Sequence, residues 1–242
     1  VGLIFHLALM TATQGFEVIP PRALWLSALS GGLFLVASVG LYLSFQRGPV
    51  RLVAPIIAAY PVLSVGWAVM RGAEVSPLQW LSVLVIIGGV SIVAALADHG
   101  TDDVPPKGPT ILLAIMAAIG FAGTFAIGQF VSESAGHMPV TLVTRITAIL
   151  LLVGGIAVLR LPFWPGRSAL PMLTAMGIAD GIALVCVISA GGLPDAQYAA
   201  VAASCFGLLT IVLAWAILRE RMTPMQWFGC ALAFGGIGYL AL

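Results

Sequence analysis

Charged side chains that interrupt long apolar stretches are the strongest chemical signal in this sequence. Asp180 lies in the middle of Leu170–Ala190, and Arg145 lies near the start of Val140–Leu159. A charge at the centre of a bilayer costs roughly 2.5–3.5 kcal/mol on insertion scales, so it persists only with a partner or a cavity. Asp180 is therefore either a group that binds a proton or a cation in a transport pathway, or a neutral, hydrogen-bonded residue between packed helices.

Two interpretations also apply to Arg145. Its guanidinium could pair with Asp180 or with an anionic group of a substrate. Alternatively, its long side chain could reach the membrane interface, because Arg145 lies close to the end of its predicted helix. The position of Arg145 in the sequence favours the interface.

A second group of polar and aromatic side chains occurs twice. Tyr60, Ser64 and Trp67 are spaced i, i+4 and i+7, which places them on one face of a helix. Phe206 and Thr210 follow Tyr60 and Ser64 by 146 residues. An aromatic ring and a hydroxyl at equivalent positions are expected if both helices face a shared central site. Packing or lipid contact is the alternative for the aromatic rings. Weaker candidates for this site are Tyr42, Thr124 and Gln129.

The sequence offers no catalytic constellation. It contains no HExxH pair, no phosphate-binding loop and no nucleophile elbow. We therefore predict that the chain is not an enzyme and carries no cofactor and no metal site. The histidines stand in different segments, and the cysteines lie in apolar stretches, where we interpret them as small hydrophobic side chains. These residues are His6, His99, His137, Cys186, Cys205 and Cys230.

Composition places the chain in a membrane. Charged residues make up 8% of the sequence, and the mean hydropathy is +1.12, whereas soluble domains are about 25% charged. A soluble protein of this length would need more polar surface, so we predict a multi-pass integral membrane protein of the plasma membrane, which in bacteria is the inner membrane. The net charge of +1 argues against nucleic acid as a partner.

Spanning helices of about 20 apolar residues can be located along most of the chain. Residues 1–10 are too short for a span, and the chain opens inside apolar sequence without a signal peptide, which indicates a fragment. Within the second span, Pro55 and Pro61 each remove a backbone donor and can kink or open the helix. The eight predicted spans are Leu24–Phe45, Val50–Met70, Leu78–Ala97, Ile111–Val131, Val140–Leu159, Leu170–Ala190, Ala196–Leu218 and Met225–Leu242.

An internal repeat relates the two halves of the sequence. Residues 74–94 read EVSPLQWLSVLVIIGGVSIVA, and residues 220–240 read ERMTPMQWFGCALAFGGIGYL. The two glutamates stand 146 residues apart, and the Pro, Gln, Trp and first Gly of each copy stand 147 apart. The Gly-Gly pairs, and Gly177 with Gly181, are expected to let helices approach closely.

The repeat predicts an all-α architecture of ten helices when complete, with eight full spans and one partial span present here. Five helices per repeat is an odd number, so the two units enter the membrane in opposite directions, as in many secondary transporters. The first repeat covers residues 1–97 and the second covers residues 109–242. Residues 98–108, DHGTDDVPPKG, are the only long polar run. We interpret them as a solvated linker rather than a metal site at His99.

Two stretches resemble the end of an EamA domain, from the ten-helix branch of the drug/metabolite transporter superfamily. They are GPVRLVAPIIAAYPVLSVGWAVMRGAEVSPLQWLSVLVIIGGV and LPDAQYAAVAASCFGLLTIVLAWAILRERMTPMQWFGCALAFGGIGYL. The resemblance implies two inverted five-helix bundles around a central cavity and transport by alternating access. GIADGIALV resembles the Gly-x-x-Asp helix of the family, which makes Asp180 a plausible cavity residue. The chain departs from the family pattern in lacking the first helix and most of the second, and in having Arg51 where members more often have a small residue.

Charge counts and the resemblance disagree on orientation. One set of alternating loops is rich in arginine, and the positive-inside rule would place that set in the cytoplasm and the C-terminus outside. The resemblance implies that both termini are cytoplasmic, and we adopt that arrangement. The arginine-rich set contains Arg47, Arg51, Lys107, Arg160, Arg167, Arg219 and Arg221.

These patterns together predict a secondary transporter of small metabolites or drugs. Its partners would be a small-molecule solute, the lipid bilayer and protons or another coupling ion, and a monomer or a homodimer would suffice. From the sequence, we expect the Asp180→Asn variant to assemble normally in the membrane and to lose the coupling of transport to an ion gradient. Alternative functions are a lipid or lipid-linked sugar flippase and a non-transporting membrane scaffold.

Overall fold

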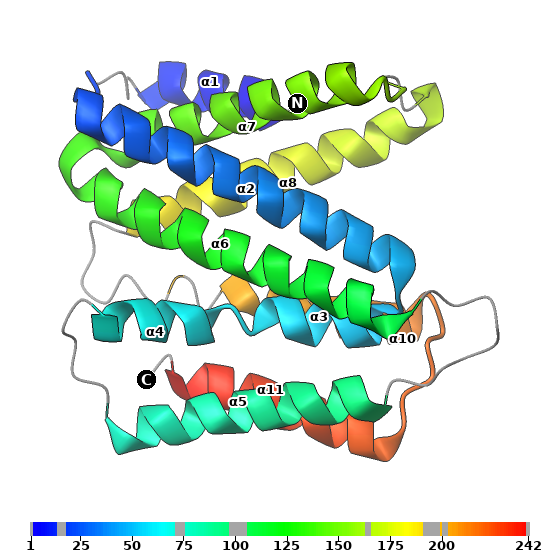
Figure 1. Ribbon diagram of the computed structural model, residues 1–242. Helices are drawn as coiled ribbons and strands as arrows, with labels where there is room; N and C mark the ends of the chain where they lie inside the picture. The colour runs from blue at the N-terminus through cyan, green and yellow to red at the C-terminus, as the bar shows by residue number, and fades with distance from the viewer. Residues whose placement is uncertain are drawn as a thin grey trace. The chain divides into compact units, whose positions relative to one another are not determined.

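The computed structural model describes residues 2–13, 18–70, 76–96, 106–162, 166–190, 199 and 203–240 (Figure 1). Helices are the only regular secondary structure in this part of the chain. Five helical segments are long and apolar enough to cross a membrane, so the chain is an all-α membrane protein. They are α2 (Pro21–Arg47), α5 (Pro77–Leu96), α6 (Lys107–Ala135), α7 (His137–Leu159) and the segment Arg167–Ser189, which joins η1 (Arg167–Ala169) to α8 (Leu170–Ser189).

The shorter apolar helices complete the described chain. They are α1 (Gly2–Thr13), α3 (Val50–Ala58), α4 (Pro61–Met70), α10 (Phe206–Ala216) and α11 (Pro224–Leu240). Most predicted spans agree with these bounds within a few residues. The start of the predicted span Ala196–Leu218, the glutamate at position 74 and most of the predicted linker lie outside the described residues.

The predicted span Val50–Met70 is not one continuous helix. It is divided into α3 and α4 by a turn at residues 59–60, directly before Pro61. Pro61 has no N–H to donate to the preceding turn. The carbonyl of Ile57 instead accepts a hydrogen bond from the N–H of Tyr60 at 3.1 Å. Pro55, in contrast, lies inside α3.

The chain folds into two compact units. Unit 1 comprises Val1–Leu35 and Gly123–Ala199, and unit 2 comprises Val36–Ala122 and Ala200–Leu242. Each unit therefore combines a segment from each half of the sequence, and α2 and α6 contribute residues to both. This division in space differs from the predicted division into sequence repeats.

Small residues bring the helices of unit 1 close together. A Cβ at Gly31 of α2 would lie 2.5 Å from the carbonyl oxygen of Thr144 in α7. A Cβ at Gly181 of α8 would lie 2.9 Å from the ring of Phe5 in α1. Close backbone approach of this kind is how membrane helices gain packing contact. A buried apolar cluster of unit 1 consists of Ala23, Val131, Ala135, Val140, Leu184 and Ile188.

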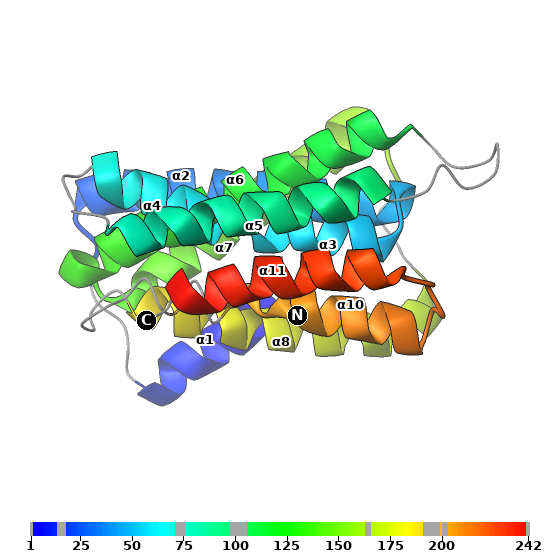
Figure 2. The same cartoon turned by 90° about the horizontal axis from the view of Figure 1, so that it is seen from below.

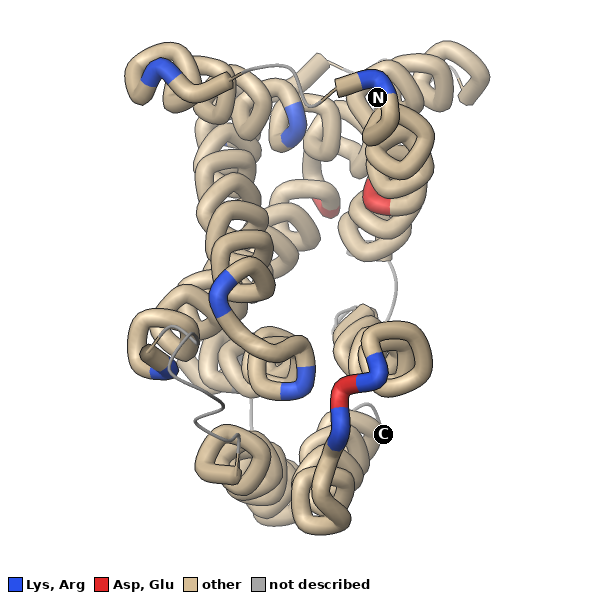
Figure 3. The backbone as a smooth tube through the Cα atoms, turned by 90° about the vertical axis from the view of Figure 1, so that its right-hand side faces the viewer, with Lys and Arg blue, Asp and Glu red and all other residues tan. Residues whose placement is uncertain are grey.

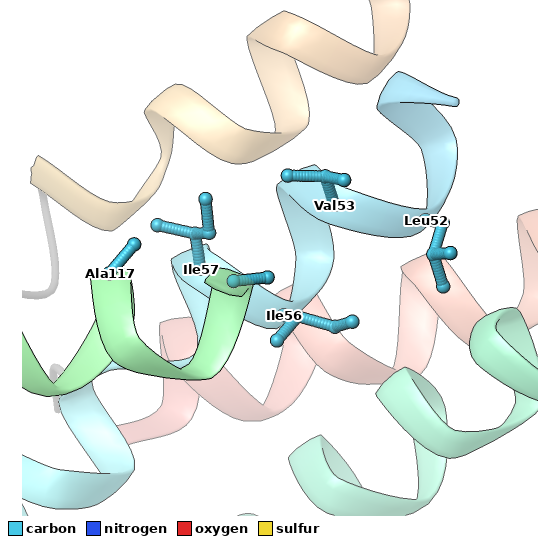
Figure 4. Packing of buried hydrophobic residues seen from close by; sticks show 6 residues of the cluster. Leu52, Val53, Ile56, Ile57 and Ala117 are labelled. Carbon is cyan, nitrogen blue, oxygen red and sulfur yellow. The ribbon is translucent and has the colours of Figure 1, made fainter. Parts of the chain in front are cut away.

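Helix α3 lies in the apolar core of unit 2. Its side chains Leu52, Val53, Ile56 and Ile57 pack with Ala114 and Ala117 of α6, as Figure 4 shows for Ala117. Almost every residue of this nine-residue helix is buried. Apart from Arg51 in the first turn, the residues of α3 are apolar, as expected of a helix buried in the core.

The two copies of the repeated sequence form the antiparallel pair α5 and α11 in unit 2 (Figures 1 and 2). A Cβ at Gly89 would lie 2.5 Å from the carbonyl oxygen of Gly229, and a Cβ at Gly236 would lie 3.0 Å from that of Ser82. Gly89 and Gly236 stand 147 residues apart, and so do Ser82 and Gly229. The two contacts are therefore equivalent: the same pair of repeat positions meets twice, with the roles of α5 and α11 exchanged.

Both helices of this pair begin with a capping box. In α5 the hydroxyl of Ser76 accepts from the N–H of Gln79 at 3.2 Å, and the Gln79 side chain accepts from the N–H of Ser76 at 2.8 Å. Thr223 and Gln226 make the same two bonds at 3.2 and 2.9 Å before α11. The recurring glutamine is thus explained by helix capping, for which Ser/Thr-x-x-Gln is the signal.

Candidate functional site

Arg145 and Asp180 form an ion pair in unit 1, which is one of the alternatives that the sequence left open. Nη2 of Arg145 in α7 lies 2.8 Å from Oδ2 of Asp180 in α8, and it also donates to the backbone carbonyl of Asp180 at 2.9 Å. The side chain of Arg145 is 7% exposed and that of Asp180 is 48% exposed. Of the two interpretations of Arg145, the structure shows a buried side chain that is paired with Asp180.

The surroundings of Arg145 hold its guanidinium in place. The ring of Phe34 lies 5.9 Å from Cζ of Arg145, within the range of a cation–π interaction. A Cβ at Gly2 would lie 2.9 Å from Nη1 of Arg145 and 2.8 Å from the carbonyl oxygen of Gly177. Glycine at position 2 therefore leaves the room that the guanidinium occupies between α1 and α8.

A buried histidine lies on the same helices. His6 of α1 is fully buried, and its Nε2 donates to the carbonyl oxygen of Met138 in α7 at 2.9 Å. Three buried polar atoms of unit 1, Nε of Arg145, Nδ1 of His6 and Oγ of Ser27, have no hydrogen-bond partner among the described residues. Buried polar groups are normally paired, so their concentration marks this region as unusual for an apolar bundle.

Asp180 gives the pair its chemical asymmetry. One of its carboxylate oxygens is bound to Arg145, while nearly half of its side chain is exposed in the described structure. A carboxylate that is bound through one oxygen can accept a proton or a cation at the other oxygen. Arg145 cannot be deprotonated in a protein, so it remains a constant positive charge next to that carboxylate. The pair can therefore change its total charge only through Asp180.

Gln129 is also held in unit 1. Its Nε2 in α6 donates to the carbonyl oxygen of Val187 in α8 at 3.0 Å. The hydroxyl of Ser132, one turn later, donates to the carbonyl of Ile188 at 3.0 Å. These two bonds tie α6 to α8, so Gln129 has a clear structural role within the unit.

Thr124 is buried in unit 1, and the remaining predicted site residues lie in unit 2. Tyr60 is 1% exposed, with its ring 6.3 Å from that of Phe121. Trp67 of α4 is 46% exposed, and Ser64 is half-buried. Tyr60, which precedes α4, therefore differs sharply in burial from Trp67. Tyr42, at the C-terminal end of α2, is exposed.

The second aromatic and hydroxyl pair is part of α10. The hydroxyl of Thr210 donates to the carbonyl oxygen of Phe206 at 2.7 Å, and Phe206 packs against the α3 cluster. Both residues thus have local structural contacts. The predicted site residues are divided between unit 1 and unit 2, and the shared central site remains a prediction.

One residue with a specific role was not recognised from the sequence. The two carboxylate oxygens of Glu220 accept the backbone N–H groups of Val50 and Arg51 at 2.9 and 3.0 Å, at the N-terminus of α3. The guanidinium of Arg51 donates to the carbonyl oxygen of Arg221. A carboxylate is favourable at a helix N-terminus, where the first N–H groups are unpaired. The recurrence of this glutamate marked the repeat but did not indicate which helix it would cap.

Charged residues are sparse along the helices (Figure 3), and no group of three or more His, Cys, Asp or Glu side chains within the described residues is placed to hold a metal ion. His99 and its neighbouring acids lie outside the described residues. A bundle of apolar helices with one arginine–aspartate pair in the described part of the chain defines a multi-pass integral membrane protein.

The comparison with protein families identifies the class further. Residues 108–242 match the model of the EamA-like transporter family, and the chain belongs to that family. This confirms the resemblance seen in the sequence. The matched residues cover the second predicted repeat. No curated protein sequence matches the chain.

A likeness to a solved structure supports the fold. One crystal structure, described only as that of a protein, has a TM-score of 0.71 with this chain at 19% sequence identity. The alignment covers 100% of this chain and 85% of that one. At this identity the likeness shows the fold alone.

Proposed function

We propose that the chain is a secondary transporter that moves small metabolites or drugs across the plasma membrane by alternating access, with coupling to protons. Membership of the EamA-like transporter family supports transport. The observation that carries the coupling is the Arg145–Asp180 pair, in which a buried arginine holds a half-exposed aspartate. An ionisable pair inside a membrane bundle is a functional hypothesis by default.

The pair suggests how binding could change the conformation. When Asp180 takes up a proton or a cation, Arg145 loses its counter-charge. A buried guanidinium without a partner costs several kcal/mol. A rearrangement of α7 and α8 that gives Arg145 another hydrogen-bond acceptor is therefore favoured. Release of the proton or cation restores the pair. In this mechanism Asp180 is the coupling residue and Arg145 is the residue that converts its charge state into helix movement.

The repeat supports the alternating geometry. The two copies of the repeated segment, α5 and α11, run antiparallel and make the same contact in both directions. An inverted repeat, with residues 1–97 as the first repeat and 109–242 as the second repeat, would give two related conformations that open to opposite sides. In this proposal Tyr42, Tyr60, Ser64, Trp67, Phe206 and Thr210 line the solute path.

Solute flux in proteoliposomes tests the proposal. A panel of amino acids, nucleosides and cationic drugs is presented to the reconstituted chain, with and without an imposed pH gradient. We expect uptake of at least one class of solute that increases with the gradient. Uptake that is the same with and without the gradient would rule out proton coupling and indicate a facilitator. Absence of flux for every soluble solute, with movement of labelled lipids instead, would favour a flippase.

A further inference from the structure

Unit 2 contains an apolar groove that the transport mechanism does not use. It has a volume of about 350 Å³, within the roughly 300–1,000 Å³ of ordinary ligand pockets. Its walls come from the α3–α4 segment, α5 and α6. The residues that line it are Ile56, Ala59, Val62, Leu63, Ile87, Val90, Ser91, Ala94, Ile111, Ile115, Ala118 and Ile119.

The sequence explains why this space is empty of side chains. The turn before Pro61 lies beside the groove. Ala59, which is part of the turn, and Val62, which follows it, both line the groove. Ala94, Ala118 and Ser91 contribute short side chains that cannot fill the space. The larger side chains Leu63, Ile87, Ile115 and Ile119 are each partly exposed and form the rim.

The chemistry of the walls limits what can bind. Ser91 is the one lining residue with a polar side chain. A polar solute in this groove would lose its hydrogen bonds to water without replacement, which costs several kcal/mol per group in apolar surroundings and disfavours a polar metabolite. A hydrocarbon chain has no hydrogen bonds to lose in this groove. The acyl chains of the bilayer are the hydrocarbon available to a membrane-spanning helix.

One end of the groove carries positive charge. Lys107, Ile111 and Ile115 are spaced i, i+4 and i+8 on α6, so Lys107 lies on the groove face at the start of that helix. Arg47 ends α2 near this point, because a Cβ at the next residue, Gly48, would lie 2.7 Å from Thr110 in the first turn of α6. Nε of Arg47 is buried without a hydrogen-bond partner in the described part of the chain.

We propose that this groove is a binding site for an anionic membrane phospholipid. One acyl chain lies between α4, α5 and α6, and the phosphate group lies at the cationic end formed by Lys107 and Arg47. Basic residues at the membrane surface attract anionic lipid headgroups, and the apolar groove adds van der Waals contacts with the acyl chain. The residues of the groove belong to unit 2, whereas the Arg145–Asp180 pair belongs to unit 1.

Native mass spectrometry of the detergent-purified chain tests the acyl-chain part. The probes are phosphatidylglycerol and phosphatidylcholine, added at equal concentration after delipidation. Ser91→Phe fills the groove from an exposed position on α5, and Leu84→Phe places the same side chain on an exposed position of α5 outside the groove. We expect Ser91→Phe to lower retention of phosphatidylglycerol by about tenfold or more, because the phenyl ring displaces the acyl chain from its contacts with the groove walls, and Leu84→Phe to leave it unchanged.

The headgroup part has its own variant. Lys107→Gln should keep a bound lipid but lose the preference for phosphatidylglycerol over phosphatidylcholine. Equal retention in Ser91→Phe and Leu84→Phe would overturn the groove as the binding site. A preference that Lys107→Gln leaves intact would overturn the cationic end. If Ser91→Phe changes the mass of the oligomer while lipid retention stays constant, the groove holds a second copy of the chain and the lipid proposal is wrong.

Discussion

At the scale of single residues, the pairing of Arg145 with Asp180 is the main finding. The sequence indicated that each charge needed a partner, but it favoured the membrane interface for Arg145. The sequence alone does not determine whether Arg145 pairs with Asp180. The pairing depends on how α7 and α8 are rotated against each other, and neither helix has a strong amphipathic pattern that fixes that rotation. The structure shows Arg145 almost fully buried and bonded twice to Asp180.

The pair makes a prediction about stability. Asp180→Asn leaves a buried guanidinium without its counter-charge, so we expect a loss of about 1–3 kcal/mol in unfolding free energy, less than the roughly 3–5 kcal/mol of a fully buried pair because Asp180 is half-exposed. This revises the expectation that the variant assembles normally. Thermal unfolding in detergent is the measurement, and Glu133→Gln, which removes an exposed acid from α6, is the control.

A double variant separates pairing from local packing. Arg145→Gln combined with Asp180→Asn removes both charges and keeps both side chains polar. We expect the double variant to be more stable than Asp180→Asn alone, because no unpaired buried charge remains. If the two single losses simply add in the double variant, the two side chains do not interact energetically.

At the scale of secondary-structure elements, most helices were predictable and their contacts were not. Runs of apolar residues of sufficient length located the spans, and proline at position 61 indicated a kink or opening. In the structure this kink is a turn at residues 59–60 between α3 and α4. The Ser/Thr-x-x-Gln caps were readable in principle, whereas the role of Glu220 at the distant N-terminus of α3 was not.

The Gly-Gly pairs show how structure refines a sequence pattern. The sequence predicted that both glycines of each pair allow close helix approach. In the structure only the second one does, since Gly88 and Gly235 have open space where a Cβ would be, while Gly89 and Gly236 face backbone atoms of the partner helix.

This difference gives a matched test. Gly89→Ala and Gly236→Ala should each cost about 1–3 kcal/mol, because the added methyl pushes α5 and α11 apart. Gly88→Ala and Gly235→Ala should be neutral or stabilise by up to about 1 kcal/mol, since alanine favours a helix over glycine. Chemical denaturation of the four variants measures it. Equal losses at all four positions would show that the α5–α11 contact is not the one described.

The capping boxes give a second prediction at this scale. Ser76→Ala and Thr223→Ala should each lower stability by about 1 kcal/mol, because each removes the acceptor for a free N–H at the start of a helix. Thr223→Ser keeps the hydroxyl and should be nearly neutral. An equal loss in Thr223→Ser and Thr223→Ala would assign the effect to the methyl group of threonine instead of the cap.

At the scale of the whole molecule, alternating access makes a prediction about exposure to water. In a background with Cys186, Cys205 and Cys230 replaced, single variants Ser64→Cys and Thr210→Cys are labelled with a membrane-impermeant thiol reagent from each side. We expect labelling from both sides in different proportions, and a change in those proportions when a transported solute is present. A scaffold protein predicts that both positions stay inert from either side.

The most direct test of the account is proton movement that accompanies solute uptake in proteoliposomes, recorded with a pH-sensitive dye. The wild-type chain is compared with Asp180→Asn and with Glu133→Gln at equal amounts of folded protein. We predict that solute drives a change in internal pH for the wild type and for Glu133→Gln, and that Asp180→Asn shows no such change. A pH change of the same size in Asp180→Asn would contradict the assignment of Asp180 as the coupling residue.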